Sequence, residues 1–542
     1  MSDPYMTLKL LDCTLRDGGY YNNWDYNPAL VDAYLAAMAA LGTDYVEIGF
    51  RSFDARGFKG GAAYSTDAWL ATLDIPAGLA IGVMINGSEL VGYSGGPAAA
   101  INSLFVPAAQ SRVSLVRIAC HLHEFVPCLD ATARLRALGY RTGINLMQIA
   151  DRSTDEIVAV ARSAEQGEVD VLYFADSMGG LSPDQVSAII KVIRCEWSGP
   201  LGVHTHDNLG LALANTLRAI SDGATWLDAT VTGMGRGPGN AKTEYLAIEL
   251  GLLERRPSNI TPLLALIRQH LKPLQQQYEW GTNPYYYLAG KHGIHPTYIQ
   301  EMLSDSRFGE EDLLSVIERL TTSDSKKFSS SRLETGRVAF ASAGTGTWSP
   351  SPLASGREVL IVAPGSTVGR HRAAIETYIR ARRPLVIALN TVDVLAPGLV
   401  DVRAASHPIR LLADHPRYRQ LGQPLIAPLS MLSPELRAKL ADLNIHDFGL
   451  TVEAGRFGFD MTACTAPNVL VAGFALGIAT SGGGASISLA GFDGFASDDP
   501  RHAEMASTLE TYLQTPGARP LRSITPTRYT QLPVTSVYAL AS

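Results

Sequence analysis

Short apolar runs alternate with longer amphipathic stretches through the first 260 residues of the chain. Each of eight runs rich in Val, Ile and Leu precedes a stretch with the apolar spacing of a helix, which is typical of parallel strands joined by helices. We predict strands at 8–13, 45–50, 80–85, 114–119, 142–147, 169–175, 201–206 and 226–231. The clearest helices are expected at 28–41, 124–138, 154–166, 183–194, 209–222 and 240–253. Eight such units in about 250 residues indicate an α/β protein with a (β/α)8 TIM barrel over residues 1–260, because an open doubly wound sheet usually has fewer strands.

The pattern changes twice after the barrel. Residues 261–340 keep helical spacing, so we expect a helical accessory domain there, and the small, polar, proline-containing stretch 341–356 has the composition of a linker. From 357 to 542 a new alternation begins with a strand at 359–362, a glycine turn and a helix at 370–382, which predicts a Rossmann-like α/β domain. The turn presents a helix N-terminus suited to an anion. It lacks the G-x-G-x-x-G spacing of dinucleotide sites.

Composition narrows the class of protein. Apolar residues make up 46% of the chain and the formal net charge is −7, with no run of Lys and Arg, which argues against a nucleic-acid partner. No uninterrupted apolar stretch near 18 residues predicts a membrane span. The N-terminal residues lack a basic segment followed by an apolar one, and the five cysteines are scattered without a CxxC pair. We therefore expect a cytoplasmic protein with reduced thiols.

Polar residues recur where the predicted strands end. In a TIM barrel the carboxyl ends of the strands carry the catalytic groups. Such groups lie in or directly after seven of the eight strands: Asp12, Arg16 and Asp17; Glu47 and Arg51; His121 and His123; Asn145 and Gln148; Asp176 and Ser177; His204 and His206; and the glycine-rich stretch 233–240. Packing needs alone would not place polar residues at one end of the barrel so often.

The pair His204 and His206 is the most specific of these features. Alternate residues of a strand point the same way, so both imidazoles face the barrel mouth. Two imidazoles and a carboxylate suit a divalent transition metal, and Asp17 supplies the carboxylate because strands 1 and 7 flank strand 8. The alternative is two hydrogen-bonded core histidines. His121 and His123 form a competing pair that could instead supply an acid or base.

Three further features have both a functional and a structural interpretation. Arg16, beside Asp17, is expected to bind substrate, although it could be a surface charge. Glu47 lies within an apolar strand, and because a lone buried carboxylate is costly, we expect it to have a partner or a ligand. The stretch 233–240 could cradle a phosphate, act as a lid, or form only a tight turn.

These motifs resemble the DRE-TIM metallolyase superfamily (HMGL-like), and within it the 4-hydroxy-2-oxovalerate aldolases. The resemblance covers residues 8–255 and rests on five motifs: Thr14–Gly18, Val46–Gly49, Asp176-Ser177, His204–Leu211 and Gly233–Asn240. It implies a metal held by Asp17, His204 and His206, with Asn240 as a further ligand. It also implies that Arg16 contacts an oxyanion and that Ser177 binds the carboxylate of a 2-oxo acid.

The chain departs from that family at one position. The aldolases have a histidine, proposed as the proton carrier, a few residues after the Arg-Asp pair, whereas residues 18–24 here contain none. Tyr20, Tyr21 and His121 are the candidates for this role, with Tyr20 first. The cysteine that the lyase branch carries in the glycine loop is also absent. The C-terminal half is distantly similar to the Rossmann-like domains of motility accessory factors and sialic-acid-type transferases.

The expected function is that of a divalent-metal-dependent aldolase, which makes or cleaves a 4-hydroxy-2-oxo acid through a pyruvate-type enolate. Its partners would be a 2-oxo acid and an aldehyde, its ion Mn²⁺ or Mg²⁺, with Co²⁺ and Zn²⁺ also compatible, and its assembly a homo-oligomer. The alternatives are a Claisen-type synthase that uses an acyl-CoA, a C-terminal domain that binds a nucleotide or nucleotide-sugar, and a binding protein with a degenerate barrel.

Overall fold

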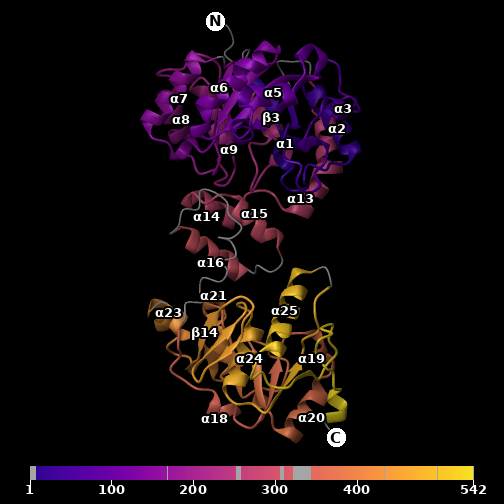
Figure 1. Ribbon diagram of the computed structural model, residues 1–542, viewed down its shortest axis with the longest axis vertical. Helices are drawn as coiled ribbons and strands as arrows, with labels where there is room; N and C mark the ends of the chain where they lie inside the picture. Colours follow the sequence, from indigo (N-terminus) through magenta and orange to yellow (C-terminus); the bar gives the residue numbers. More distant parts are fainter. Residues whose placement is uncertain are drawn as a thin grey trace. The chain divides into compact units, whose positions relative to one another are not determined.

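The computed structural model describes residues 8–167, 169–251, 258–305, 310–321, 344–432, 434–496 and 499–540. These residues form two compact units (Figure 1). The first, called here the barrel unit, contains the described residues up to Ser304. Thr321 also groups with the barrel unit. The second unit contains Asp305, residues 310–320 and the described residues from 344 onward.

Eight parallel strands of the barrel unit close into a barrel, as predicted. They are β1 Lys9–Asp12, β2 Tyr45–Phe50, β3 Ala80–Asn86, β4 Val113–Cys120, β5 Arg141–Leu146, β6 Val171–Asp176, β7 Leu201–Thr205 and β8 Trp226–Ala229. Each strand pairs with the next, and β8 closes the ring against β1 with Leu227 opposite Leu10. All eight carboxyl ends therefore meet at one mouth.

Helices follow the strands and enclose them (Figure 1). They are α1 Thr14–Gly18, α2 Pro28–Leu41, α3 Asp67–Leu70, α4 Gly87–Val91, α5 Pro97–Leu104, α6 Leu122–Ala137, α7 Thr154–Gln166, α8 Pro183–Ile193, α9 Ala212–Ser221 and α10 Thr243–Glu249. Local sequence sets several of their starts. The Asn27 side chain accepts the Ala29 N–H with Pro28 in the first helical position, and Ser153 forms a capping box with Glu156.

The chain after the barrel is helical, through α12 Thr261–Leu266, the π-helical turn Ile267–Leu271, α13 Lys272–Tyr278, α14 Pro284–His292, α15 Thr297–Ser304 and α16 Glu310–Thr321. Helices α14 and α15 pack over the barrel mouth. Asn208 donates to the Tyr286 carbonyl (3.2 Å), and Gln300 accepts the Gly237 N–H (2.9 Å) and donates to the Tyr20 carbonyl (3.2 Å). Residues 310–320 of α16 group with the second unit. Residues 306–309 and 322–340 of the predicted accessory domain lie outside the described residues.

The second unit contains a seven-stranded parallel sheet in the order β13-β12-β11-β10-β9-β17-β18. The strands are β9 Glu358–Val362, β10 Leu385–Leu389, β11 Val402–Ala404, β12 Leu425–Ala427, β13 Ile445–Asp447, β17 Ser486–Ala490 and β18 Leu521–Ser523. The sheet grows from β9 in one direction and resumes on the other side of β9 with β17. Alternate residues of β9 belong to different apolar clusters, Ile361 with Phe474 and Leu360 with Ile375, so helices cover both faces.

Beside this sheet lies a small one made of β14 Gly449–Val452, β16 Ala463–Ala466 and β15 Gly458–Phe459. Besides α16, the described helices of the second unit are α18 Ser351–Ala354, α19 Ser366–Arg370, α20 Arg372–Arg382, α21 Pro408–Ala413, α22 His415–Leu421, α23 Pro434–Lys439, α24 Val471–Ser481, α25 Pro500–Gln514 and α26 Val537–Leu540. Among the described residues, no helix is both long and apolar enough to cross a membrane.

Part of the expected linker is built into the second unit. The Trp348 N–H donates to the Asp447 carbonyl (2.9 Å), and its ring stacks on His446 with the centroids 4.5 Å apart. The Gly356 N–H donates to the Gly483 carbonyl (3.0 Å). Residues 344–356 thus differ from the linker that their composition predicts, because one aromatic anchor and a few backbone bonds secure an otherwise small and polar stretch.

Candidate metal and substrate site

A cavity of about 50 Å³ lies at the mouth of the barrel. Its lining includes Arg16, Asp17, Tyr20, Ser177, His204 and His206. The short helix α1 carries Arg16 and Asp17, and Tyr20 lies just after it. This helix starts immediately after β1 because Asp12 accepts both the N–H and the hydroxyl of Thr14 (2.9 and 2.6 Å). Residues from several of the predicted strand ends therefore lie around one cavity.

Asp17, His204 and His206 form a compact, buried set of ligand atoms. Oδ2 of Asp17 lies 3.8 Å from Nε2 of each histidine. Neither this oxygen nor Nε2 of His206 has a hydrogen-bond partner among the described residues. Unpaired buried polar atoms are costly. These two unpaired atoms, together with Nε2 of His204 close to them, form a set of nitrogen and oxygen ligands that fits a divalent cation.

The charge states of these groups agree with a metal site. Burial, and then the charge of His204, lowers the pKa of His206 to about 3, so its ring is neutral and can act as a ligand. Its Nδ1 lies 3.0 Å from the Asp176 carbonyl, which takes the Nδ1 proton and leaves the lone pair on Nε2. Burial opposes ionisation of Asp17, but the charges of Arg16 and His204 outweigh it and hold the pKa of Asp17 below its usual range.

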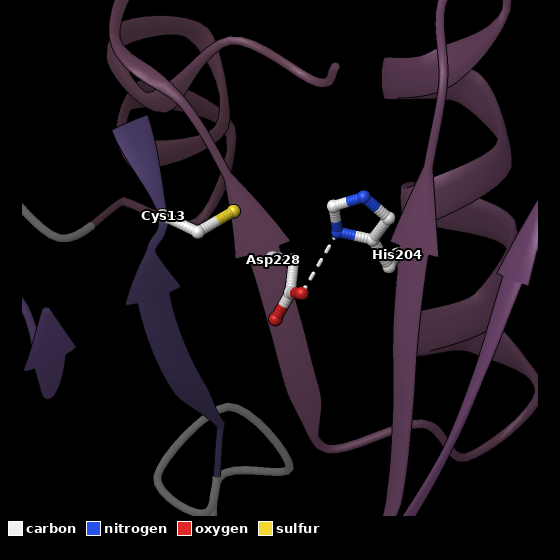
Figure 2. Close-up of side chains that lie close together, drawn as sticks. All are labelled: Cys13, His204 and Asp228. Atoms are coloured by element: carbon white, nitrogen blue, oxygen red, sulfur yellow. Dashed lines mark hydrogen bonds and ion pairs between the residues drawn. The ribbon is translucent and has the colours of Figure 1, made fainter. Parts of the chain in front are cut away.

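His204 is oriented by a carboxylate (Figure 2). Its Nδ1 lies 2.9 Å from Oδ2 of Asp228 on β8, and Nη1 of Arg117 holds the same carboxylate at 2.7 and 2.9 Å. Cys13, Asp228 and His204 also lie close enough to suggest a second metal site. However, the Cys13 thiol donates to the Ala229 carbonyl (3.6 Å), and burial raises its pKa well above the usual value. Asp228 is therefore a support that turns Nε2 of His204 toward Asp17.

Asn240 lies beside the Asp17, His204 and His206 cluster. Its amide nitrogen is 3.0 Å from Nε2 of His204, and its Oδ1 has no partner among the described residues. The glycine stretch lets the chain come this close: a Cβ at Gly235 would lie 1.9 Å from Oδ1 of Asn240 and 2.7 Å from Oδ2 of Asp17. The loop therefore forms a wall of the site, and the Gly237 N–H is already bound to Gln300 rather than free for a phosphate.

Arg16 presents one unused donor. Its Nε binds Glu47 (2.7 Å) and its Nη1 binds Asp17 (2.6 Å), while the buried Nη2 has no hydrogen-bond partner among the described residues. Glu47 is itself fully buried. Arg117 donates to both of its carboxylate oxygens at 2.7 Å, so the buried charge is paired. Glu47 does not line the cavity. Two arginines hold its carboxylate, so Glu47 has the partner that its burial predicts, and it positions Arg16.

The remaining predicted residues divide into two groups. Ser177 and Tyr20 line the cavity; the Ser177 hydroxyl oxygen accepts the Gln148 N–H (2.9 Å), and the Tyr20 ring is 38% exposed. Tyr21 points elsewhere, because its hydroxyl donates to the Gly237 carbonyl (2.5 Å). His121 caps α6 and is not among the residues that line the cavity.

Sequence reasoning missed two residues at the mouth. Arg236 lines the cavity, and its guanidinium lies 5.8 Å from the centre of the Tyr20 ring. His295, between α14 and α15, accepts the Thr297 N–H at Nδ1 (3.3 Å). Burial, followed by the charges of Arg236, His206 and His121, lowers the pKa of His295 to about 2. His295 could not be predicted from the positions where the strands end, because it belongs to the helical segment after the barrel.

Known proteins resemble the barrel unit. The HMGL-like family model matches residues 108–267. The 4-hydroxy-2-oxovalerate aldolase of Carboxydothermus hydrogenoformans is 30% identical over 246 residues, which are 45% of this chain and 71% of that protein. The oxaloacetate decarboxylase of Mycobacterium tuberculosis is 29% identical over 243 residues, 44% of this chain and 69% of that protein. The crystal structure of the N-terminal domain of a Bacteroides vulgatus protein described as an aldolase has a TM-score of 0.50 and 33% identity, and covers 55% of this chain and 98% of its own. The chain therefore belongs to the HMGL-like family of DRE-TIM lyases, and its barrel is an enzyme of that family.

Proposed function

We propose that the barrel unit is a divalent-metal-dependent aldolase that cleaves or forms a 4-hydroxy-2-oxo acid through the enolate of pyruvate. The observation that carries this proposal is the unused Nη2 donor of Arg16 beside the unpaired atoms of Asp17 and His206, in a cavity of about 50 Å³. That volume suits a three-carbon acid. The relatives named as an aldolase and as an oxaloacetate decarboxylase support the class of reaction, because both of those reactions break a carbon–carbon bond that leaves a pyruvate enolate.

Each side chain has a role in this chemistry. A divalent ion held by Asp17, His204 and His206 would supply a Lewis acid for the ketone oxygen of the 2-oxo acid. Arg16 donates Nη2–H to the same oxygen as negative charge develops there, and Glu47 and Asp17 keep its guanidinium in place. Ser177 is placed to donate its hydroxyl to the substrate carboxylate, since its oxygen already accepts a backbone N–H.

The C4 hydroxyl must lose a proton during cleavage, and we propose that the Tyr20 hydroxyl carries it to solvent, accepting that proton as it releases its own to water. Tyr20 borders both the cavity at the ligands and a second cavity that adjoins it, which is where the C3–C4 bond would lie. His295 is the alternative, since it shares the electrostatic surroundings of Arg236 and His206.

The Tyr20→Phe protein is expected to lose about 10²–10⁴-fold in aldol cleavage, the range for a general acid or base, while retaining its metal. Tyr21→Phe is the matched control, because its hydroxyl is bound to Gly237 and it should change the rate little. The assay is pyruvate release from a racemic 4-hydroxy-2-oxo acid. A fully active Tyr20→Phe protein together with an inactive His295→Asn protein would transfer the role to His295.

Exchange of the pyruvate methyl protons with solvent, followed by NMR, tests the proposed function itself. We expect exchange in the presence of Mn²⁺, Mg²⁺, Co²⁺ or Zn²⁺ and none after chelation, because the enolate forms without the aldehyde. A protein that exchanges nothing with any of these ions is not a pyruvate aldolase. Turnover of an acyl-CoA with a 2-oxo acid would instead support the Claisen-type synthase.

A further inference from the structure

A second cavity of about 160 Å³ adjoins the one at the metal ligands. The two share Tyr20, Phe50 and Asn86 in their linings. The rest of the second lining consists of four polar residues, Ser52, Asp54, Lys59 and Glu89, with Trp24 and Ala63. In the proposed aldolase, this is the space into which the substituent of the aldehyde would extend from C4.

The polar groups of the second cavity are already held in position. The Glu89 carboxylate accepts the Phe53 N–H (2.6 Å), the Ser52 hydroxyl (2.9 Å) and the Asn86 amide (3.1 Å). Lys59 donates to Asp54 (2.9 Å), and its side chain is only 23% exposed. No other partner of Lys59 lies among the described residues, so two of its three donors remain for a ligand.

We propose that the natural aldehyde carries hydroxyl groups on its substituent and that this second cavity, through Lys59 and Asn86, recognises them. The inference rests on the proposed function. An alkyl group in this cavity would displace the water that hydrates the charged side chains and would offer them no hydrogen bonds, which is costly. Hydroxyl groups would replace the hydrogen bonds of the displaced water. The relatives named for 4-hydroxy-2-oxovalerate handle a methyl substituent, so this chain would differ from them.

The test is aldol addition to pyruvate with glyceraldehyde and erythrose, compared with acetaldehyde and propanal. We expect kcat/KM to favour the hydroxylated aldehydes by about 100-fold or more, because a site built to bind hydroxyl groups rejects analogues that lack them. Lys59→Met, which keeps the length of the side chain, should reduce that preference at least tenfold, and Lys191→Met on the exposed face of α8 should not. Equal or better use of acetaldehyde, with pyruvate exchange intact, overturns the inference and leaves the aldolase proposal standing. Absence of pyruvate exchange overturns both.

An independent observation concerns the second unit, where a cavity of about 340 Å³ lies at the carboxyl ends of β9, β10 and β17. The strand order reverses between β9 and β17, and open α/β sheets bind ligands at such a point. The volume falls within the roughly 300–1,000 Å³ typical of ligand sites. It is nearer the size of one nucleotide than of two.

The start of α19 cannot serve as the phosphate site that the glycine turn predicts. The Asp493 carboxylate already accepts the Ser366 hydroxyl (3.1 Å), the Thr367 N–H (3.0 Å) and the Thr367 hydroxyl. A Cβ on Gly365 would lie 2.2 Å from the Gly491 carbonyl oxygen, so the two loops touch. The protein's own carboxylate thus takes the place of a bound anion.

The cavity and its rim favour an aromatic ring with a negatively charged tail. Phe492, Phe495 and Tyr529 supply apolar walls, and Asn390, directly after β10, adds a polar residue to the lining. At the rim, exposed Arg528 donates Nη1–H to the Phe495 carbonyl (3.1 Å), and no described carboxylate pairs with it. We infer that this cavity binds a mononucleotide, with the base between the aromatic walls and the phosphate at Arg528.

Calorimetric titration of the full chain with AMP, GMP, CMP and UMP and with the four nucleosides tests this site. At least one nucleotide should bind with micromolar affinity, about tenfold or more tightly than its nucleoside. Arg528→Gln should remove that difference, whereas Arg382→Gln at the exposed end of α20 should keep it. Absence of binding by all four nucleotides at 1 mM, or an unchanged difference in Arg528→Gln, overturns the inference.

Discussion

The His204→Ala protein is expected to bind no divalent ion and to show no aldol cleavage above background. Two ligands would remain, and Asp228 would lose the imidazole that it orients. Loss of an outer partner of a metal ligand costs about 10–100-fold in metal affinity, so loss of the ligand itself should exceed 100-fold. Metal content after gel filtration and pyruvate release from a 4-hydroxy-2-oxo acid are the two measurements.

His123→Ala is the matched control, since that side chain is 79% exposed and belongs to no ligand set among the described residues. It should retain both metal and activity. Asp228→Asn should fall between the two variants, with a 10–100-fold weaker affinity for the ion. Full metal occupancy in the His204→Ala protein would show that the ion does not lie at the Asp17, His204 and His206 cluster.

The barrel could be predicted because its evidence is local and repeated. Each of the eight strand–helix units can be predicted from its own apolar spacing. An error of one or two residues in the bounds of a strand leaves the number of strands unchanged. Period-two alternation likewise placed His204 and His206 on one side of β7. The strand-end rule then placed Asp17 near them, although β1 and β7 are separated by β8.

The partners of the buried charges could not be predicted in the same way. Alternation shows that Glu47, Arg117 and Asp228 point into the barrel, but not that Arg117 on β4 bridges the other two. That contact depends on side-chain length across the interior. The sequence therefore predicts that Glu47 has a partner, but not which residues hold it. Breaking such a buried pair costs about 3–5 kcal/mol, so its members are costly to replace singly.

Residues that reach a site from other parts of the chain could not be predicted either, because their positions depend on tertiary packing. His295 belongs to a helical segment with no period that marks its face, and only the packing of Gln300 and Tyr286 on the barrel brings it to the mouth. In the second unit, Asp493 follows β17 yet occupies the start of α19, more than 120 residues earlier. A helix N-terminus can be predicted from the sequence, but the sequence does not show that the carboxylate of Asp493 already occupies it.

The Arg16→Lys protein is expected to keep its metal but to lose roughly 10²–10³-fold in kcat, as when a preorganised oxyanion donor is removed. The guanidinium of Arg16 binds Glu47 and Asp17 and still has Nη2 to offer, whereas one ammonium cannot span these three directions. Arg51→Lys is the control for loss of a buried arginine. Arg51 binds the Ser65 and Leu104 carbonyls and pairs with Asp67, but it does not line the cavity, so its variant should lose stability and retain kcat. Thermal unfolding, metal content and pyruvate proton exchange are measured on all three proteins. A kcat near that of the unmodified protein in Arg16→Lys would show that Arg16 serves the fold alone and that the developing charge is stabilised elsewhere, with Arg236 as the next residue to test.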